Sequence, residues 1–197
     1  MRTGRLEAFS DGVLAIVITI MVLELSVPDE PTFAALGGSL IGLVTYLLSF
    51  IYIGIYWSNH HHMFQLVRHV NGAILWANLA LLFFLSLVPF TTAWMDDTHF
   101  AKPPVTIYGV NLLAAAVAYC VLQLAIFRAE GPESLLRQAV GRDLKGKLSP
   151  VIYIVGILGS FVAAWLGILA YVAVAVIWLV PDRRAERFVH DHAISPD

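Results

Sequence analysis

The 197-residue sequence predicts an all-α polytopic membrane protein with six transmembrane helices, and three observations lead to this fold class. Residues of the set AVILMFWYC make up 59% of the chain and charged residues only 13%. Soluble domains carry roughly 45–50% apolar residues, glycine included, and about 25% charged residues. The apolar residues also form long runs, with Lys and Arg at their ends. One globular core cannot bury so much apolar surface, so lipid is the expected solvent.

The individual spans follow from their lengths. A spanning helix needs roughly 20 residues, because the hydrocarbon core is about 30 Å thick and each residue rises about 1.5 Å. Four apolar runs meet this length, and a fifth run from Ser149 to Val180 contains no charge. One helix over that run would reach roughly 50 Å, so we predict two short helices that meet near residues 164–167. The predicted spans of this single domain (1–197) are 6–27, 36–57, 72–92, 105–127, 149–163 and 166–180.

The charges decide the number of spans and their orientation. With six spans and a cytoplasmic N-terminus, eleven of the twelve Lys and Arg lie inside and only Lys102 lies outside, as the positive-inside rule requires. Five spans would place the Arg183-Arg184 pair outside. We therefore expect six spans with both termini in the cytoplasm. Because the basic residues are dispersed at span ends, no nucleic-acid partner is expected.

The first span contains an acidic residue. A helix starting at Gly12 and ending at Leu25 would be about 21 Å long, too short to cross, so the helix is expected to begin near Arg5. Asp11 then lies about one and a half turns inside it, where a carboxylate is costly without partners. Arg5 lies about 120° away around the helix, so the partners should come from another helix or subunit. The alternative is that Asp11 only favours the helix N-terminus through the macrodipole.

A second face of the first span is almost entirely apolar. Gly12, Ile16, Thr19, Ile20 and Leu23 recur at helical spacing and share this face. Periodicity alone indicates an ordinary packing surface for lipid or another helix.

The histidines near the end of the second span do not form a metal site. His60, His61 and His62 are consecutive, so their side chains point about 100° apart on a helix. His61, Gln65 and His69 share a face, but two His and one Gln are a poor set of zinc ligands. We therefore predict no metal and no cofactor. One or two of the histidines are expected to pair with Asp11 or with a backbone carbonyl.

At this point the sequence resembles a known family. The motif Arg5-x-x-x-Phe9-Ser10-Asp11 at the start of the first span is similar to the signature of the transmembrane protein 175 family, which are potassium channels of animal lysosomes and of prokaryotes. The resemblance covers essentially the whole chain. Its other parts are Tyr56-Trp57-x-x-His60-His61-x-x-Phe64, Asn78, Pro89-Phe90 and Trp178-Leu179-Val180-Pro181. Animal members carry two six-helix repeats, whereas this chain has one, like the prokaryotic members.

The resemblance implies a homotetramer in which the first helix of each subunit lines the pore. Rings of Ile16, Ile20 and Leu23 would form the constriction and filter, with Thr19 as a polar layer. A structural polar network of Arg5, Ser10 and Asp11 would tie the first helix to the second helix, which carries His60 and His61. A single-repeat member is expected in the cell (plasma or inner) membrane.

The expected function is that of a potassium-permeable channel subunit with passive flux, and not of an enzyme. The sequence lacks the Thr-Val-Gly-Tyr-Gly filter, so a carbonyl filter is not available. The alternative is a proton- or cation-coupled secondary transporter that uses Asp11 and the histidines as a relay. We see no inverted repeat and no Gly/Pro-broken span, and the apolar face does not offer the polar groups that a carrier site needs. A membrane enzyme or haem protein is disfavoured, because no nucleophile-and-base set is present.

Overall fold

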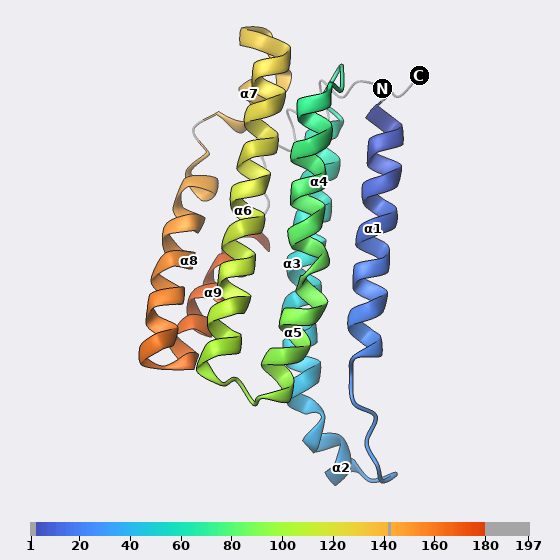
Figure 1. Cartoon of the computed structure of the whole chain (residues 1–197), viewed down its shortest axis with the longest axis vertical. Helices are drawn as coiled ribbons and strands as arrows, with labels where there is room; N and C mark the ends of the chain where they lie inside the picture. The colour runs from blue at the N-terminus through green and yellow to red at the C-terminus, as the bar shows by residue number, and fades with distance from the viewer. Residues whose placement is uncertain (1–2, 142, 180–197) are drawn as a thin grey trace.

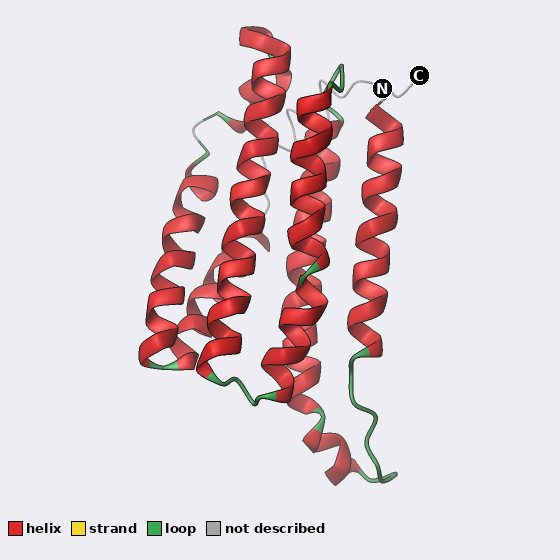
Figure 2. Cartoon of the chain, viewed as in Figure 1, coloured by secondary structure: helices red, strands yellow, loops and turns green. Residues whose placement is uncertain are grey.

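The structure, a computed structural model, describes residues 3–141 and 143–179. This part of the chain folds into helices joined by turns, with no strand, which confirms the all-α fold class (Figure 2). The helices are α1 (Thr3–Leu23), α2 (Phe33–Gly38), α3 (Leu40–Phe64), α4 (Gly72–Ser86), α5 (Val88–Asp97), α6 (Lys102–Glu130), η1 (Gly131–Glu133), α7 (Leu135–Val140), α8 (Leu144–Val162) and α9 (Ala164–Leu179).

Five stretches of the described chain are long and apolar enough to cross a membrane, with α4 and α5 counted together over Gly72–Asp97. The shorter apolar helix α9 corresponds to the sixth predicted span, and the six-span count stays a prediction. The second predicted span begins four residues too early, because residues 33–38 form the separate helix α2. Thr32 caps that helix, with its hydroxyl accepting a hydrogen bond from the Ala35 N–H at 3.2 Å.

The third span is interrupted near its middle, contrary to our expectation that no span is broken. α4 ends at Ser86 and α5 begins at Val88, with Pro89 in the first turn of α5. Proline has no N–H and its ring crowds the preceding turn, so the hydrogen-bond ladder is interrupted here. Leu87 between the two helices keeps a right-handed helical conformation (φ −84°, ψ −9°), so the span bends but does not unwind.

The long C-terminal apolar run forms two helices, as predicted, and their junction is Ala163. This residue is extended (φ −150°, ψ 133°), one residue before the predicted meeting region. The two helices pack closely through glycines. A Cβ atom on Gly167 would lie 3.0 Å from Cβ of Ser160 and 3.1 Å from Cγ1 of Val105, so only glycine fits there without a shift of its neighbours.

The helices alternate in direction, so that the basic residues gather at one end of the bundle, whereas acidic residues lie at both ends (Figure 1). The basic end, where α1 starts and α3 and α6 finish, holds Arg5, Arg68, Arg128, Arg137, Lys145 and Lys147. The acidic end, where α1 and α5 finish, holds Glu24, Asp29, Glu30, Asp96 and Asp97, together with Lys102. Arg2, Arg142, Arg183, Arg184 and Arg187 lie outside the described residues. This arrangement agrees with the charge alternation used to count the spans.

The middle of the bundle is filled by buried side chains that are joined through hydroxyl groups. The Ser49 hydroxyl lies 2.7 Å from the Thr92 hydroxyl and 3.0 Å from that of Tyr108. The Tyr52 hydroxyl donates to the backbone carbonyl of Tyr171 at 2.6 Å. These bonds connect α3, α5, α6 and α9. We call these five residues the hydroxyl cluster. α1 lies outside it, at the edge of the bundle, in contact with α3, α4 and α5 (Figure 1).

Candidate ion pathway

One face of α1 is buried against the rest of the subunit. Its residues recur every three or four positions, so they form one continuous stripe along the helix. The buried residues are Leu6, Ser10, Leu14, Val17 and Met21. They hold α1 at a fixed rotation about its own axis.

The other face of α1 is uncovered. Ile16, Ile20 and Leu23 are 59%, 42% and 81% exposed, although all three are large and apolar. Thr19 lies on the same face, and its hydroxyl is bonded within the helix, 3.1 Å from the carbonyl oxygen of Ala15 and 2.9 Å from that of Ile16. We call Ile16, Thr19, Ile20 and Leu23 the α1 stripe. They share one face, as the periodicity indicated, and their role in ion passage stays a prediction.

A chain of buried hydrogen bonds fixes the basic end of α1 to α3 and α4. The Ser10 hydroxyl donates to the carbonyl oxygen of Leu6 at 2.9 Å and accepts from Nδ2 of Asn78 at 3.0 Å. His60 Nε2 lies 2.7 Å from Oδ1 of Asn78. Because that oxygen only accepts, the imidazole proton resides on Nε2. Ser10 and Asn78 are fully buried and His60 is 2% exposed, so every partner in this chain has its bond in a low-dielectric environment.

A second set of contacts lies nearby but closer to the surface. The indole Nε1 of Trp57 donates to Oδ1 of Asp11 at 3.0 Å, and the Trp57 ring stacks on His61 with centroids 6.3 Å apart. His61 Nδ1 faces Oε1 of Glu7 at 3.5 Å, and its Nε2 lies 2.9 Å from the amide nitrogen of Gln65. Since the amide nitrogen only donates, the imidazole proton resides on Nδ1 and points at Glu7.

The structure therefore brings together most of the predicted polar residues, but in two separate groups. Ser10 and His60 belong to the buried chain, and Asp11 and His61 belong to the surface set. Within the subunit the hydrogen-bond partner of Asp11 is Trp57, and not one of the histidines as we expected. Arg5 is exposed and has no hydrogen bond or ion pair among the residues that the structure describes.

Two of the linking residues were not in the predicted network. Trp57 was interpreted only as part of the motif. Asn78 is a polar residue inside the third span, and such residues commonly form hydrogen bonds to neighbouring helices. A usable signal existed for Trp57, because it lies four residues before His61 and therefore on the same face of the second helix.

Comparisons with known proteins agree with this geometry. The model of a protein family described as the endosomal/lysosomal potassium channel TMEM175 matches residues 5–89 of this chain. These residues include α1, α3 and α4, which carry both polar groups and the α1 stripe.

Individual relatives match over most of their length. A potassium channel of Chryseobacterium sp. (strain P1-3) is 51% identical over 192 residues, which are 98% of this chain and 100% of the relative. A potassium channel of Chamaesiphon minutus is 34% identical over 84% of this chain and 88% of the relative. The crystal structure of a lysosomal potassium-selective channel TMEM175 homolog from Chamaesiphon minutus superposes with a TM-score of 0.74, at 31% identity, over 90% of this chain and 96% of that chain.

Proposed function

Since this chain belongs to the TMEM175 family of potassium channels, we propose that it is a subunit of a potassium-permeable channel whose ions pass along the α1 stripe. One observation carries the proposal. An edge helix is fixed in rotation by its buried face and its hydrogen bonds, and it presents large apolar side chains, up to 81% exposed, on the other face. Such a surface must be covered either by lipid or by the same surface of other subunits.

One subunit supplies only one wall of a pathway, so the proposal includes a closed homo-oligomer. We propose a homotetramer, in which four α1 stripes converge on the symmetry axis and each residue forms a ring. Ile16, Ile20 and Leu23 would then enclose an apolar neck that gates partly by dewetting. A cation that loses part of its hydration shell in this neck pays a desolvation cost. This cost is smaller for K⁺ than for the smaller Na⁺, so a preference for K⁺ follows without a carbonyl filter.

The tightly packed interior of the subunit is an argument for a pathway that runs outside the subunit, along α1. The hydroxyl cluster occupies the space between α3, α5, α6 and α9, and its residues are less than 10% exposed. The protein is a multi-pass membrane protein, with lipid as the partner of its other exposed apolar faces. We propose the cell membrane as its location, with the basic end and both termini in the cytoplasm. No cofactor other than the permeant K⁺ and no catalytic reaction belong to the proposal.

The test is ion flux through the purified protein in liposomes. We expect K⁺ flux to exceed Na⁺ flux under equal gradients, and to rise with concentration without saturating at low turnover. A saturating turnover of hundreds of ions per second or less, or flux that requires a proton gradient, would instead indicate a proton- or cation-coupled secondary transporter. The mass of the detergent-solubilised complex tests the assembly separately, and a monomeric protein with full flux would contradict the shared pathway.

A further inference from the structure

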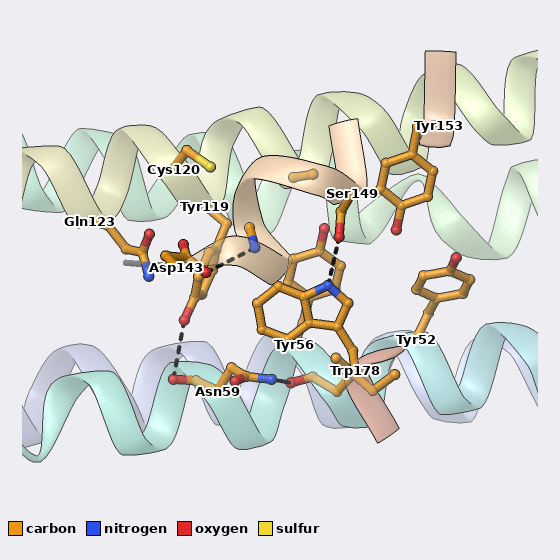
Figure 3. Close-up of a pocket in the computed structure, with 13 residues that line it drawn as sticks. Tyr52, Tyr56, Asn59, Tyr119, Cys120, Gln123, Asp143, Ser149, Tyr153 and Trp178 are labelled. Atoms are coloured by element: carbon orange, nitrogen blue, oxygen red, sulfur yellow. Dashed lines mark hydrogen bonds between the residues drawn. The ribbon is translucent and has the colours of Figure 1, made fainter. Parts of the chain in front are cut away.

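A cavity far from the α1 stripe lies among α3, α6, α8 and α9, at the basic end of the bundle (Figure 3). It encloses about 500 Å³ of empty space, including its open mouth. Much of this space belongs to the mouth, so a bound molecule would occupy the mouth as well as the enclosed part. The proposed ion pathway does not use this cavity.

Aromatic side chains from all four helices line the cavity. Tyr52 and Tyr56 come from α3, Tyr119 from α6, Tyr153 from α8 and Trp178 from α9. The rings lie at angles to each other and are not stacked in parallel. Tyr56 and Tyr119 meet edge to face with centroids 6.0 Å apart, and Tyr52 and Tyr153 are tilted by 40° at 6.5 Å. In the view of Figure 3, Trp178 and Tyr56 lie between Tyr119 on one side and Tyr52 and Tyr153 on the other.

Hydrogen bonds fix the positions of these rings. Trp178 Nε1 donates to the hydroxyl of Ser149 at 2.8 Å, which joins α9 to the first turns of α8. The Tyr52 hydroxyl is used by the hydroxyl cluster. With their polar atoms engaged in these bonds, Trp178 and Tyr52 offer the cavity mainly their ring surfaces, which carry the negative end of the aromatic quadrupole.

A carboxylate completes one side of the cavity. Asp143 precedes α8, and its Oδ1 accepts a hydrogen bond from the N–H of Gly146 at 2.8 Å, so it caps the helix. Gly146 also lines the cavity, and a Cβ atom there would collide with the Asp143 carboxylate. Asp143 is half-buried.

We propose that this cavity binds an organic ammonium ion with an apolar body, such as a quaternary amine. Aromatic faces attract a cation within about 6 Å of the ring centroid, and aromatic cages are the usual sites for quaternary ammonium groups. The carboxylate supplies the opposite charge, and the apolar lining, which includes Ile55 and Ala116, suits the body of the ligand.

The chain contains its own reporter for this site. Cys120 is the single cysteine of the sequence and lines the cavity from α6. We would compare its modification by trimethylammonium-ethyl methanethiosulfonate, which carries the proposed cation, with that by the neutral methyl methanethiosulfonate, following the intact mass of the purified full-length protein. The rate ratio of the two reagents, divided by the same ratio for N-acetylcysteine, reports the preference of the cavity for the cation. Changes in the intrinsic reactivity of the thiol cancel in this ratio.

We expect a normalised ratio above one in the native protein, and a fall of roughly fivefold in Asp143→Asn, as for the loss of one unit charge near water. Asparagine caps helices as well as aspartate does, so this variant keeps the fold. The matched control is Asp97→Asn at the acidic end, which should leave the ratio unchanged. Benzyltrimethylammonium should slow both reagents in the native protein and much less in Asp143→Asn.

The rings are tested in the same way. Tyr119→Phe keeps the aromatic face and should keep the ratio, whereas Tyr119→Leu should lower it about threefold, within the range for one cation–π contact. A normalised ratio of one that Asp143→Asn does not change would overturn the proposal. So would a Cys120 that reacts with neither reagent, because the cavity would then be closed to such molecules. None of these readouts depends on ion flux, so they stand or fall separately from the proposed channel function.

Discussion

The two faces of α1 differ in almost every respect. The buried face is held by the core and by the Ser10–Asn78–His60 chain, whose hydrogen bonds lie within the subunit. The exposed face, the α1 stripe, consists of apolar side chains and one threonine that is bonded to its own helix. The buried face thus positions α1 and leaves the exposed face uncovered by the rest of the subunit.

In the proposed channel, one helix would serve both the fold of the subunit and permeation. Substitutions on the buried face should act on stability, because they leave polar groups without partners in a low-dielectric environment. Substitutions on the exposed face should act on ion preference and leave the fold of the subunit intact. The following predictions test this division, beginning with the largest expected effect.

Asn78→Leu should destabilise the protein most. It removes the partner of both His60 and Ser10, and each buried unpaired group costs about 1–3 kcal/mol. We expect a loss of about 2–4 kcal/mol in unfolding free energy, measured by denaturation in detergent. Ser86→Ala is the control, because the Ser86 hydroxyl is exposed and donates only to the carbonyl oxygen of Phe83 in its own helix. Equal stability of the two variants would show that the buried chain does not hold α1.

Ile16→Asn and Ile20→Asn should change permeation more than stability. A ring of amides would compensate either cation for lost water, so conduction should rise and the preference for K⁺ over Na⁺ should fall by up to about tenfold, or about 1.4 kcal/mol. Leu23→Asn, near Glu24, should act more weakly. Ile18→Asn is the control, since Ile18 packs against the core and should affect folding alone. Reversal potentials of the four variants decide whether the α1 stripe lines the pathway. A change in ion preference confined to Ile18→Asn would place the pathway on the other face of α1.

Asp11→Ala should have an intermediate effect. Asp11 is exposed and its partner in the subunit is the Trp57 indole, so the loss should be about 1 kcal/mol and not the larger cost of breaking a buried ion pair. Asp11→Asn can still accept this hydrogen bond and should retain most of the stability. The melting temperatures of the two variants give the comparison. A loss of more than about 3 kcal/mol in Asp11→Ala would indicate that a second subunit buries the carboxylate.

Thr19→Val should have the smallest effect of the series. The Thr19 hydroxyl already donates within its own helix, and valine has nearly the same shape. We expect less than a twofold change in the K⁺ to Na⁺ ratio, measured by reversal potential, and less than about 0.5 kcal/mol in stability. A larger change in selectivity would mean that the hydroxyl oxygen coordinates the permeating ion.

The sequence predicted that the residues of the α1 stripe share one face, because a helix face follows the 3.6-residue period of the sequence pattern; their role in ion passage stays a prediction. It also predicted the all-α fold and the split of the C-terminal run, since both follow from length and composition. The partner of Asp11 could not be predicted in this way. Whether Trp57 or a histidine reaches Asp11 depends on the relative rotation of α1 and α3, which a single sequence does not specify.

The break at Leu87 and the early part of the second span were missed for local reasons. Pro89 was interpreted as part of a family motif, although its missing N–H is enough to interrupt the helix. It lies three residues after the end of α4. Thr32 was not considered as a helix cap, so residues 33–38 were assigned to the following span. Both features depend on a single side chain, whereas the predicted spans were derived from averages over about twenty residues.

The position of the acidic end has a consequence for the supply of ions. The chain passes directly from Leu23 of the α1 stripe to Glu24, and Asp29 and Glu30 follow in the same connection. Repeated around a symmetric assembly, these carboxylates would give the entrance a negative potential that raises the local concentration of K⁺ above that of the bulk solution. Ionic strength limits the reach of this field to about 8 Å at 0.15 M and about 30 Å at 0.01 M. Conductance in dilute electrolyte should therefore exceed the value obtained by linear scaling from concentrated electrolyte, with the entrance acting as a reservoir of cations.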